Sequence, residues 1–308
     1  MDTPKTKIAF YKKRSFGDKL NACFDFIKEN WKPLLKFSTY LILPLCMLQS
    51  LTLNGFMSSY MTLMGEMNLG VEDFPASFIM QYLLTIVWMM IGSLIMYSLV
   101  YSLMQLYNSR ENGLEGLKFA ELKPVLFKNI KRYLIVFLFL LAIMIVAMVV
   151  IVGLAFLLLP TLFLTLGALV IVAIPLALFL PIYMFEDIPL LEAFKKTFKL
   201  GFATFGGILG ISIVAGLIAS VVQGATTTPW YIGMVIKTFF TLSEGGAAAG
   251  DSFLYTFGMY LLGILQTYGT YISMIISIIA IAYQYAHANE VVNGVSIKSD
   301  IENFDQLV

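Results

Sequence analysis

Charged and amide side chains are missing from the middle of this chain. Between Tyr133 and Phe185 the sequence runs for 53 residues without Asp, Glu, Lys, Arg, His, Asn or Gln. A helix of a water-soluble protein keeps one face polar, so this run excludes an ordinary soluble core. Because about 20 apolar residues cross the hydrocarbon layer of a bilayer, the run predicts two crossings joined by a turn at Pro160.

Charge is scarce in the chain as a whole. Charged residues make up 13% of its 308 residues, against 59% hydrophobic residues, and the formal net charge is +1. Basic residues gather only in short segments that flank apolar runs, which argues against nucleic-acid binding. The composition predicts an all-α, polytopic membrane protein.

Residues that bind metals or form disulfides are few. The sequence has one histidine, His287, and two cysteines, Cys23 and Cys46. Both cysteines fall on or near the side predicted below to be cytoplasmic, where a disulfide is not expected. The sequence contains no Gly-rich nucleotide loop, zinc-ligand pair or nucleophile elbow. We therefore expect no cofactor, no metal and no enzymatic activity, and we interpret His287 as an interfacial residue.

Six hydrophobic stretches are long enough to cross a membrane. They cover about residues 34–60, 77–107, 133–158, 162–185, 205–224 and 253–286. The segment 225–252 is predicted to be an external loop. Within it, residues 231–242 place apolar side chains on one helical face, which indicates an interfacial helix anchored by Trp230.

The basic residues predict the orientation. Nineteen of the 20 Lys and Arg fall in residues 1–36, 108–132, 186–202 and the chain end, and Lys237 is the exception. Cytoplasmic segments carry such an excess, so both termini are predicted to be cytoplasmic.

We expect one membrane domain over residues 1–308. It consists of a cytoplasmic amphipathic segment at 1–33, a six-span region at 34–286 and a cytoplasmic tail at 287–308.

Three of the predicted cytoplasmic segments have the same form, an amphipathic stretch with lysines that leads directly into a span. They are residues 16–31, 124–133 and 190–199. Aligning Ala22 with Ala193 pairs Lys28 with Lys199. Such helices lie in the headgroup layer with their lysines toward anionic lipid. The pattern predicts a threefold repeat of one interfacial helix and two spans. The alternative is that any loop between spans looks basic and amphipathic.

From Leu157 onward the chain resembles a bacterial family of six-helix membrane proteins. The resemblance rests on the sequences LLLP at 157–160, PIY at 181–183, Glu186, EAFKKTFKLG at 192–201 and YQY at 283–285. That family is related to the membrane domain preceding some glycerophosphodiester phosphodiesterases, and it includes stand-alone inner-membrane proteins. The resemblance implies six helices and an inner-membrane location. We do not extend it to phosphodiesterase activity, because a metal-dependent site needs several histidines and carboxylates together.

Two groups of residues are candidates for binding. The first is expected to bind lipid headgroups or a cytoplasmic partner, or otherwise only to cap and solvate a surface helix. It consists of Glu186, Glu192, Lys195, Lys196, Lys199 and Lys28. The second, Gln223 with Gln266, is a candidate lining for an apolar-cargo groove, although polar groups in spans more often bridge helices.

The span cores carry no ionisable residue, which argues against a transporter coupled to protons or sodium through buried carboxylates. Our leading hypothesis is a non-enzymatic inner-membrane protein that acts as a scaffold, accessory subunit or membrane-homeostasis factor. Its partners would be membrane lipids and a membrane protein. The alternative is a carrier or flippase for a lipid or other apolar molecule, with a lateral groove between helix pairs.

Overall fold

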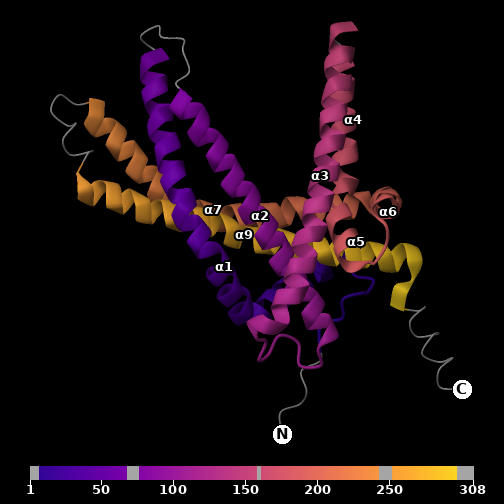
Figure 1. The fold of residues 1–308 in the computed structure, drawn as a ribbon. Helices are drawn as coiled ribbons and strands as arrows, with labels where there is room; N and C mark the ends of the chain where they lie inside the picture. The colour runs from indigo at the N-terminus through magenta and orange to yellow at the C-terminus, as the bar shows by residue number, and fades with distance from the viewer. Residues whose placement is uncertain (1–6, 68–75, 158–160, 243–251, 297–308) are drawn as a thin grey trace, which may run out of the picture. The chain divides into compact units, whose positions relative to one another are not determined.

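The computed structural model describes residues 7–67, 76–157, 161–242 and 252–296 (Figure 1). Most of these residues form helices, and the described part of the chain contains no strand. The helices are α1 (Phe16–Met67), α2 (Ala76–Ser109), α3 (Phe119–Leu157), α4 (Thr161–Leu176), α5 (Phe179–Phe185), α6 (Leu190–Ala203), α7 (Phe205–Leu242) and α9 (Phe253–Asn293). Six helical stretches are long and apolar enough to span a membrane. The predicted all-α, polytopic membrane fold is confirmed.

The chain divides into two compact units. The first unit contains residues 1–34, 97–216 and 276–308, and the second contains 35–96 and 217–275. Helices α3, α4, α5 and α6 belong entirely to the first unit. Helices α1, α2, α7 and α9 each contribute residues to both units, so the boundary does not follow a linker in the sequence.

The surface of α3 is that of a lipid-facing helix. Only 6% of its most apolar stretch is buried. Its exposed side chains include Met144, Ile145, Val146, Met148 and Val149. An apolar surface of this extent is not tolerated in water, but it is the ordinary state of a helix in a bilayer.

A kink at Asn30 separates the amphipathic start of α1 from the first span. The backbone of Asn30 has φ −114° and ψ 20°, outside the helical region. Its buried side-chain amide donates a hydrogen bond to the carbonyl of Phe26 at 3.0 Å. Asn side chains that bond nearby backbone in this way compete with regular helix. The kink lies within a few residues of the predicted start of the span.

The three predicted interfacial helices are joined to their spans in two ways. Helix α6 stops before α7 at Thr204, whose φ −126° and ψ 27° nearly repeat the angles of Asn30. The second amphipathic stretch instead continues into its span within the single helix α3. A predicted interfacial stretch thus precedes a span three times, with a break in the first and third, and the position of these stretches in the headgroup layer stays a prediction. The threefold repeat as a symmetry of the fold stays a prediction.

The fourth span is broken, whereas the sequence predicted a continuous helix over residues 162–185. Helices α4 and α5 are separated at Ala177 and Leu178. The N–H groups of these two residues bond carbonyls three residues back, at 3.2 and 3.0 Å. Pro175 and Pro181 lie on either side, and each removes one donor from the helical ladder. Two missing donors so close together favour a tight turn over a regular helix.

The predicted external loop at 225–252 is wrong in its first part. Helix α7 continues through Pro229, so residues 231–242 are its extension rather than a separate interfacial helix. Trp230 is buried, and its Nε1 donates to Oδ1 of Asn54 at 2.8 Å. The indole packs in the second unit with Met234 and Met259. This packing keeps the helix intact across the proline, and Trp230 is not an interfacial anchor.

Three predicted features lie outside the described residues. They are the turn at Pro160, the loop residues 243–251 and the end of the tail at 297–308.

Candidate functional site

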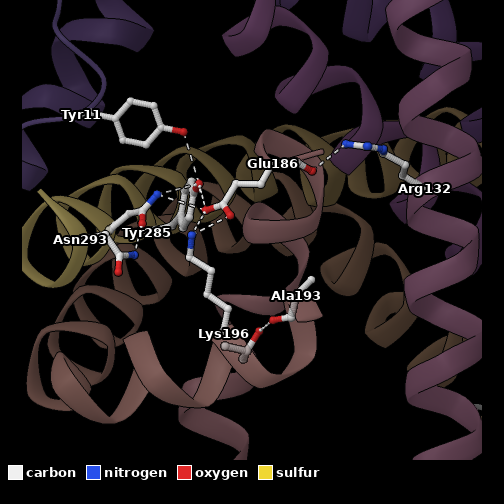
Figure 2. Close-up of polar contacts among 9 residues, drawn as sticks. Tyr11, Arg132, Glu186, Ala193, Lys196, Tyr285 and Asn293 are labelled. Atoms are coloured by element: carbon white, nitrogen blue, oxygen red, sulfur yellow. Dashed lines mark hydrogen bonds and ion pairs between the residues drawn. The ribbon is translucent and has the colours of Figure 1, made fainter. Parts of the chain in front are cut away.

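Glu186, the residue after α5, lies at the centre of a polar cluster in the first unit (Figure 2). Its side chain is 15% exposed. Oε1 accepts a hydrogen bond from the Tyr285 hydroxyl at 2.7 Å and another from Nδ2 of Asn289 at 3.1 Å. Nζ of Lys196 lies 2.7 Å from both carboxylate oxygens. One carboxylate therefore joins the end of α5 to α6 and α9.

The segment before α1 is attached to the same end of α9. The hydroxyl of Tyr11 lies 3.3 Å from that of Tyr285. Burial raises the pKa of Tyr11 above its ordinary value, so the hydroxyl keeps its proton and can donate. The backbone N–H of Arg14 donates to Nδ1 of His287 at 3.0 Å. His287 thus acts as a hydrogen-bond acceptor that fastens the N-terminal segment.

Arg132 of α3 binds the carboxyl end of α5. Its Nη1 donates to the main-chain carbonyls of Tyr183, Met184 and Glu186 at 2.9, 3.3 and 3.2 Å. Its Nη2 bonds the carboxylate of Asp187. The guanidinium also lies over the Tyr183 ring, 5.2 Å from the centroid. A planar guanidinium suits this place, because a helix leaves its last carbonyls without donors.

A neutral amide from α2 completes the contacts to this segment. Nε2 of Gln105 donates to the carbonyl of Met184 at 2.6 Å. Nδ2 of Asn129, in α3, donates to Oε1 of Gln105 at 2.9 Å. Helices α2, α3, α6 and α9 therefore all hold the short segment that ends at Glu186.

The six residues predicted to bind headgroups or a partner occupy two kinds of environment. Glu186 and Lys196 form an internal ion pair, with 15% and 23% of their side chains exposed. The exposed members are Glu192, Lys195 and Lys199 on α6, and Lys28 on α1. Glu186 and Lys196 are therefore internal to the first unit, and the other four residues lie on its surface. That these residues bind lipid or protein stays a prediction.

The predicted groove residues Gln223 and Gln266 both belong to the second unit. Gln223 is exposed on α7, and its Nε2 lies 3.4 Å from Oγ1 of Thr270. Oε1 of Gln266 is buried and has no hydrogen-bond partner among the described residues. The groove stays a prediction.

A cavity of about 280 Å³ lies in the first unit. Its walls come from α2, α3, α9 and the junction of α4 with α5, and none of its lining residues is charged. The polar groups of the lining belong to Tyr97, Tyr101, Tyr133 and Ser277. Apolar pockets with a few polar groups are the usual form of small-molecule sites.

The cavity and the Glu186 cluster are connected through packed rings. Tyr101 contacts Phe185 edge-to-face, with ring centroids 5.6 Å apart. Phe185 in turn stacks on Tyr285, at 5.9 Å, and Tyr285 donates to Glu186. The cluster therefore supports one wall of the cavity.

The described residues contain no group of three or more His, Cys, Asp or Glu placed to hold a metal ion. Cys23 and Cys46 are buried free thiols. At Glu186 the carboxylate is occupied by an ammonium, a hydroxyl and an amide, and these contacts make it an anchor between helices.

The sequence reasoning singled out Glu186 and Lys196 but not Arg132, Tyr285 or Asn289 as their associates. The signal for Tyr285 and Asn289 was the polar, aromatic end of the sixth span, which entered only through the family resemblance. Arg132 was counted only among the basic residues of the 108–132 loop. Contacts over 99 and 103 residues cannot be located by local spacing.

Comparison of the chain with protein-family models, curated proteins and solved structures finds no match. The relation to the six-helix family therefore stays a prediction.

Proposed function

We propose that this chain is a non-enzymatic integral protein of a bacterial inner membrane, acting as a scaffold, accessory subunit or membrane-homeostasis factor. The observation that carries the proposal is the fixation of α6 by the Glu186–Lys196 pair. A helix held in this way offers a rigid contact surface rather than a mobile loop.

The fixed helix carries apolar and charged groups on its outer side. Leu191 and Phe202 are 63% and 51% exposed, and three charged side chains are exposed on the same helix. Together they form the α6 surface, which consists of Leu191, Glu192, Lys195, Lys199 and Phe202. Its opposite face is buried through Ala193, Thr197, Leu200 and Gly201.

This combination suits a position in the headgroup layer. Apolar side chains enter the acyl boundary, while each lysine near an anionic surface contributes about 1 kcal/mol. Lys28 extends the basic character to the amphipathic start of α1, in the same unit. With both termini in the cytoplasm, the α6 surface meets anionic lipid and the cytoplasmic side of a partner membrane protein.

The use of the buried polar groups supports a non-enzymatic role. Glu186 is bonded by Lys196, Tyr285 and Asn289, and the Arg132 guanidinium is bonded to main-chain carbonyls. A general acid or base needs access to a substrate proton. The hydrogen bonds of these groups are therefore made within the protein.

Chemical crosslinking in native membranes followed by affinity purification tests the proposal. We expect a discrete neighbouring protein that is lost in the double variant Lys195→Gln/Lys199→Gln. The matched control is Lys118→Gln, which removes an exposed lysine from the loop before α3. Recovery of an isolated protein with no stable neighbour would contradict the proposal.

A second function, carriage or flipping of a lipid or other apolar molecule, is favoured by one observation, the uncharged cavity of the first unit. Transport of a fluorescent lipid between the leaflets of reconstituted vesicles tests it. An unchanged leaflet distribution compared with protein-free vesicles would rule it out.

A further inference from the structure

The cavity of the first unit is lined by tyrosines whose hydroxyl groups form no hydrogen bond with the described residues. The rings of Tyr97 and Tyr101 lie 6.3 Å apart, and those of Tyr97 and Tyr133 lie 5.6 Å apart. Among the described residues, no hydrogen bond involves any of the three hydroxyls. Tyr101 is 1% exposed, so the residue as a whole is buried.

These hydroxyls are not sealed inside the protein. None of the three hydroxyl oxygens is among the fully enclosed, unbonded polar atoms of the described residues, so each keeps some accessible surface. Three tyrosines with unbonded hydroxyls line one apolar space, and a hydrogen-bonding molecule in that space would give these hydroxyls a partner.

The main chain of one lining residue also lacks its usual helical donor. Ala177 lines the cavity at the break between α4 and α5. Its carbonyl has no helical donor, because the residue four positions later is Pro181. Irregular backbone at membrane depth is tolerated where it is buried or lines a cavity, and interrupted helices mark binding sites in membrane proteins.

The cavity is accessible from outside. Apart from Tyr101, Val136 and Ile278, its lining residues are half-buried rather than buried. Its 280 Å³ lies just below the roughly 300–1,000 Å³ of sites that enclose whole small ligands. The space therefore suits one end of a longer molecule, whose remainder extends into the bilayer beside α3.

We propose that this cavity binds the oxygen-bearing end of a neutral membrane lipid, such as a hydroxyl, ester or ketone group. The tyrosine hydroxyls would donate to that oxygen, and the Ala177 carbonyl would accept from a lipid hydroxyl. A charged headgroup is excluded because no lining side chain carries an opposite charge. The inference is independent of the accessory role, since a scaffold and a carrier can both hold a lipid.

Photocrosslinking of the full chain in vesicles tests this site. The probe is a diacylglycerol with a diazirine near the ester end of one acyl chain, and phosphatidylglycerol with the same group is the charged comparison. We expect the diacylglycerol to label peptides containing residues 133–140 or 176–180, and phosphatidylglycerol to label them at least fivefold less. Equal labelling by the two probes would overturn the assigned ligand class.

Tyrosine variants separate the site from general lipid contact. Each of Tyr97→Phe, Tyr101→Phe and Tyr133→Phe removes a hydroxyl but keeps the ring, and each should lower labelling about fivefold, as expected for one hydrogen bond. Tyr231→Phe, at a 56% exposed position in the second unit, is the matched control and should label as the native chain does.

A cavity-filling variant, Ala177→Leu, keeps all three hydroxyls and should also lower labelling at least fivefold. Intact folding is verified for each variant by its unfolding temperature in detergent. Labelling that is unchanged by these substitutions would overturn the proposal. So would labelling spread evenly over the lipid-facing residues 144–152, since this is the result for boundary lipid only.

Discussion

Lys196 donates to both carboxylate oxygens of Glu186, at 2.7 Å each, and the two residues stand on opposite sides of the turn between α5 and α6. The same carboxylate accepts from Tyr285 of α9. A basic segment that follows an apolar run is expected in any membrane protein by its charge alone. The ion pair distinguishes the lysines of this basic segment, because Lys196 is internal whereas Lys195 and Lys199 are exposed.

Replacement of Glu186 by Gln should destabilise the protein. The change removes the ion pair and leaves the Lys196 ammonium without its counter-charge in a mostly buried place. We expect a loss of about 2–3 kcal/mol in the free energy of unfolding, less than for a fully enclosed pair because both side chains are partly exposed. Thermal unfolding in detergent measures it.

Glu192→Gln is the matched control for that change, because Glu192 is an exposed glutamate in the first turn of α6. Its effect should stay within about 0.5 kcal/mol. Equal unfolding temperatures for the two variants would show that the pair does not fasten α6.

Two glycines near the end of α6 should respond oppositely to alanine. A Cβ at Gly201 would lie 2.5 Å from Cβ and 2.7 Å from Cα of Pro175, so Gly201→Ala should force α6 away from α4 and lower the unfolding temperature. Gly206 is exposed in α7 and has nothing within 4 Å of such a Cβ. Gly206→Ala should therefore raise stability by up to about 1 kcal/mol through helix propensity. Stabilisation by both substitutions would contradict the close packing of α6 on α4.

Hydropathy was enough to predict the fold class, because a bilayer demands long apolar helices whatever their partners. The breaks were harder to predict. Pro175 and Pro229 are both prolines in apolar stretches, yet a turn follows the first and the helix continues through the second. The difference lies in tertiary packing: Trp230 is buried with Met234 and Met259, whereas Pro175 has a second proline six residues later. The burial of Trp230 cannot be predicted from a single sequence.

Some residues of the candidate site could be predicted from the sequence, and others could not. Glu186 was noticeable as the first charge after a long uncharged run. The tyrosines of the cavity were not, because aromatic residues at helical spacing are ordinary core residues. Tyr97 and Tyr133 meet across two helices, and only the fold reveals that both residues line one space.

The burial of Trp230 predicts a large effect of its truncation. Trp230→Ala should destabilise the protein by about 3 kcal/mol, since it leaves a void and deprives Asn54 of its indole donor. The neighbouring Tyr231 is 56% exposed, so Tyr231→Ala should cost much less. If unfolding in detergent showed Tyr231→Ala to be the more damaging change, the inward orientation of Trp230 would be wrong.

The distribution of basic residues predicts sidedness, which single cysteines can report. Lys118→Cys and Ser252→Cys place thiols at exposed positions before α3 and before α9. A membrane-impermeant maleimide should label the Ser252 variant in intact cells and the Lys118 variant only after permeabilisation. Cys23 and Cys46 are buried and should give little background. The reverse labelling pattern would place the termini outside the cytoplasm.

The accessory role rests on the α6 surface as a fixed contact site, and a photoreactive amino acid placed on it tests this claim most directly. Leu191, 63% exposed on α6, is the test position, and Val146, 64% exposed on lipid-facing α3, is the control. After irradiation of living cells, we predict a discrete protein adduct from position 191 that disappears with Lys195→Gln/Lys199→Gln. Position 146 should give only lipid adducts. Only lipid adducts from both positions would contradict the account.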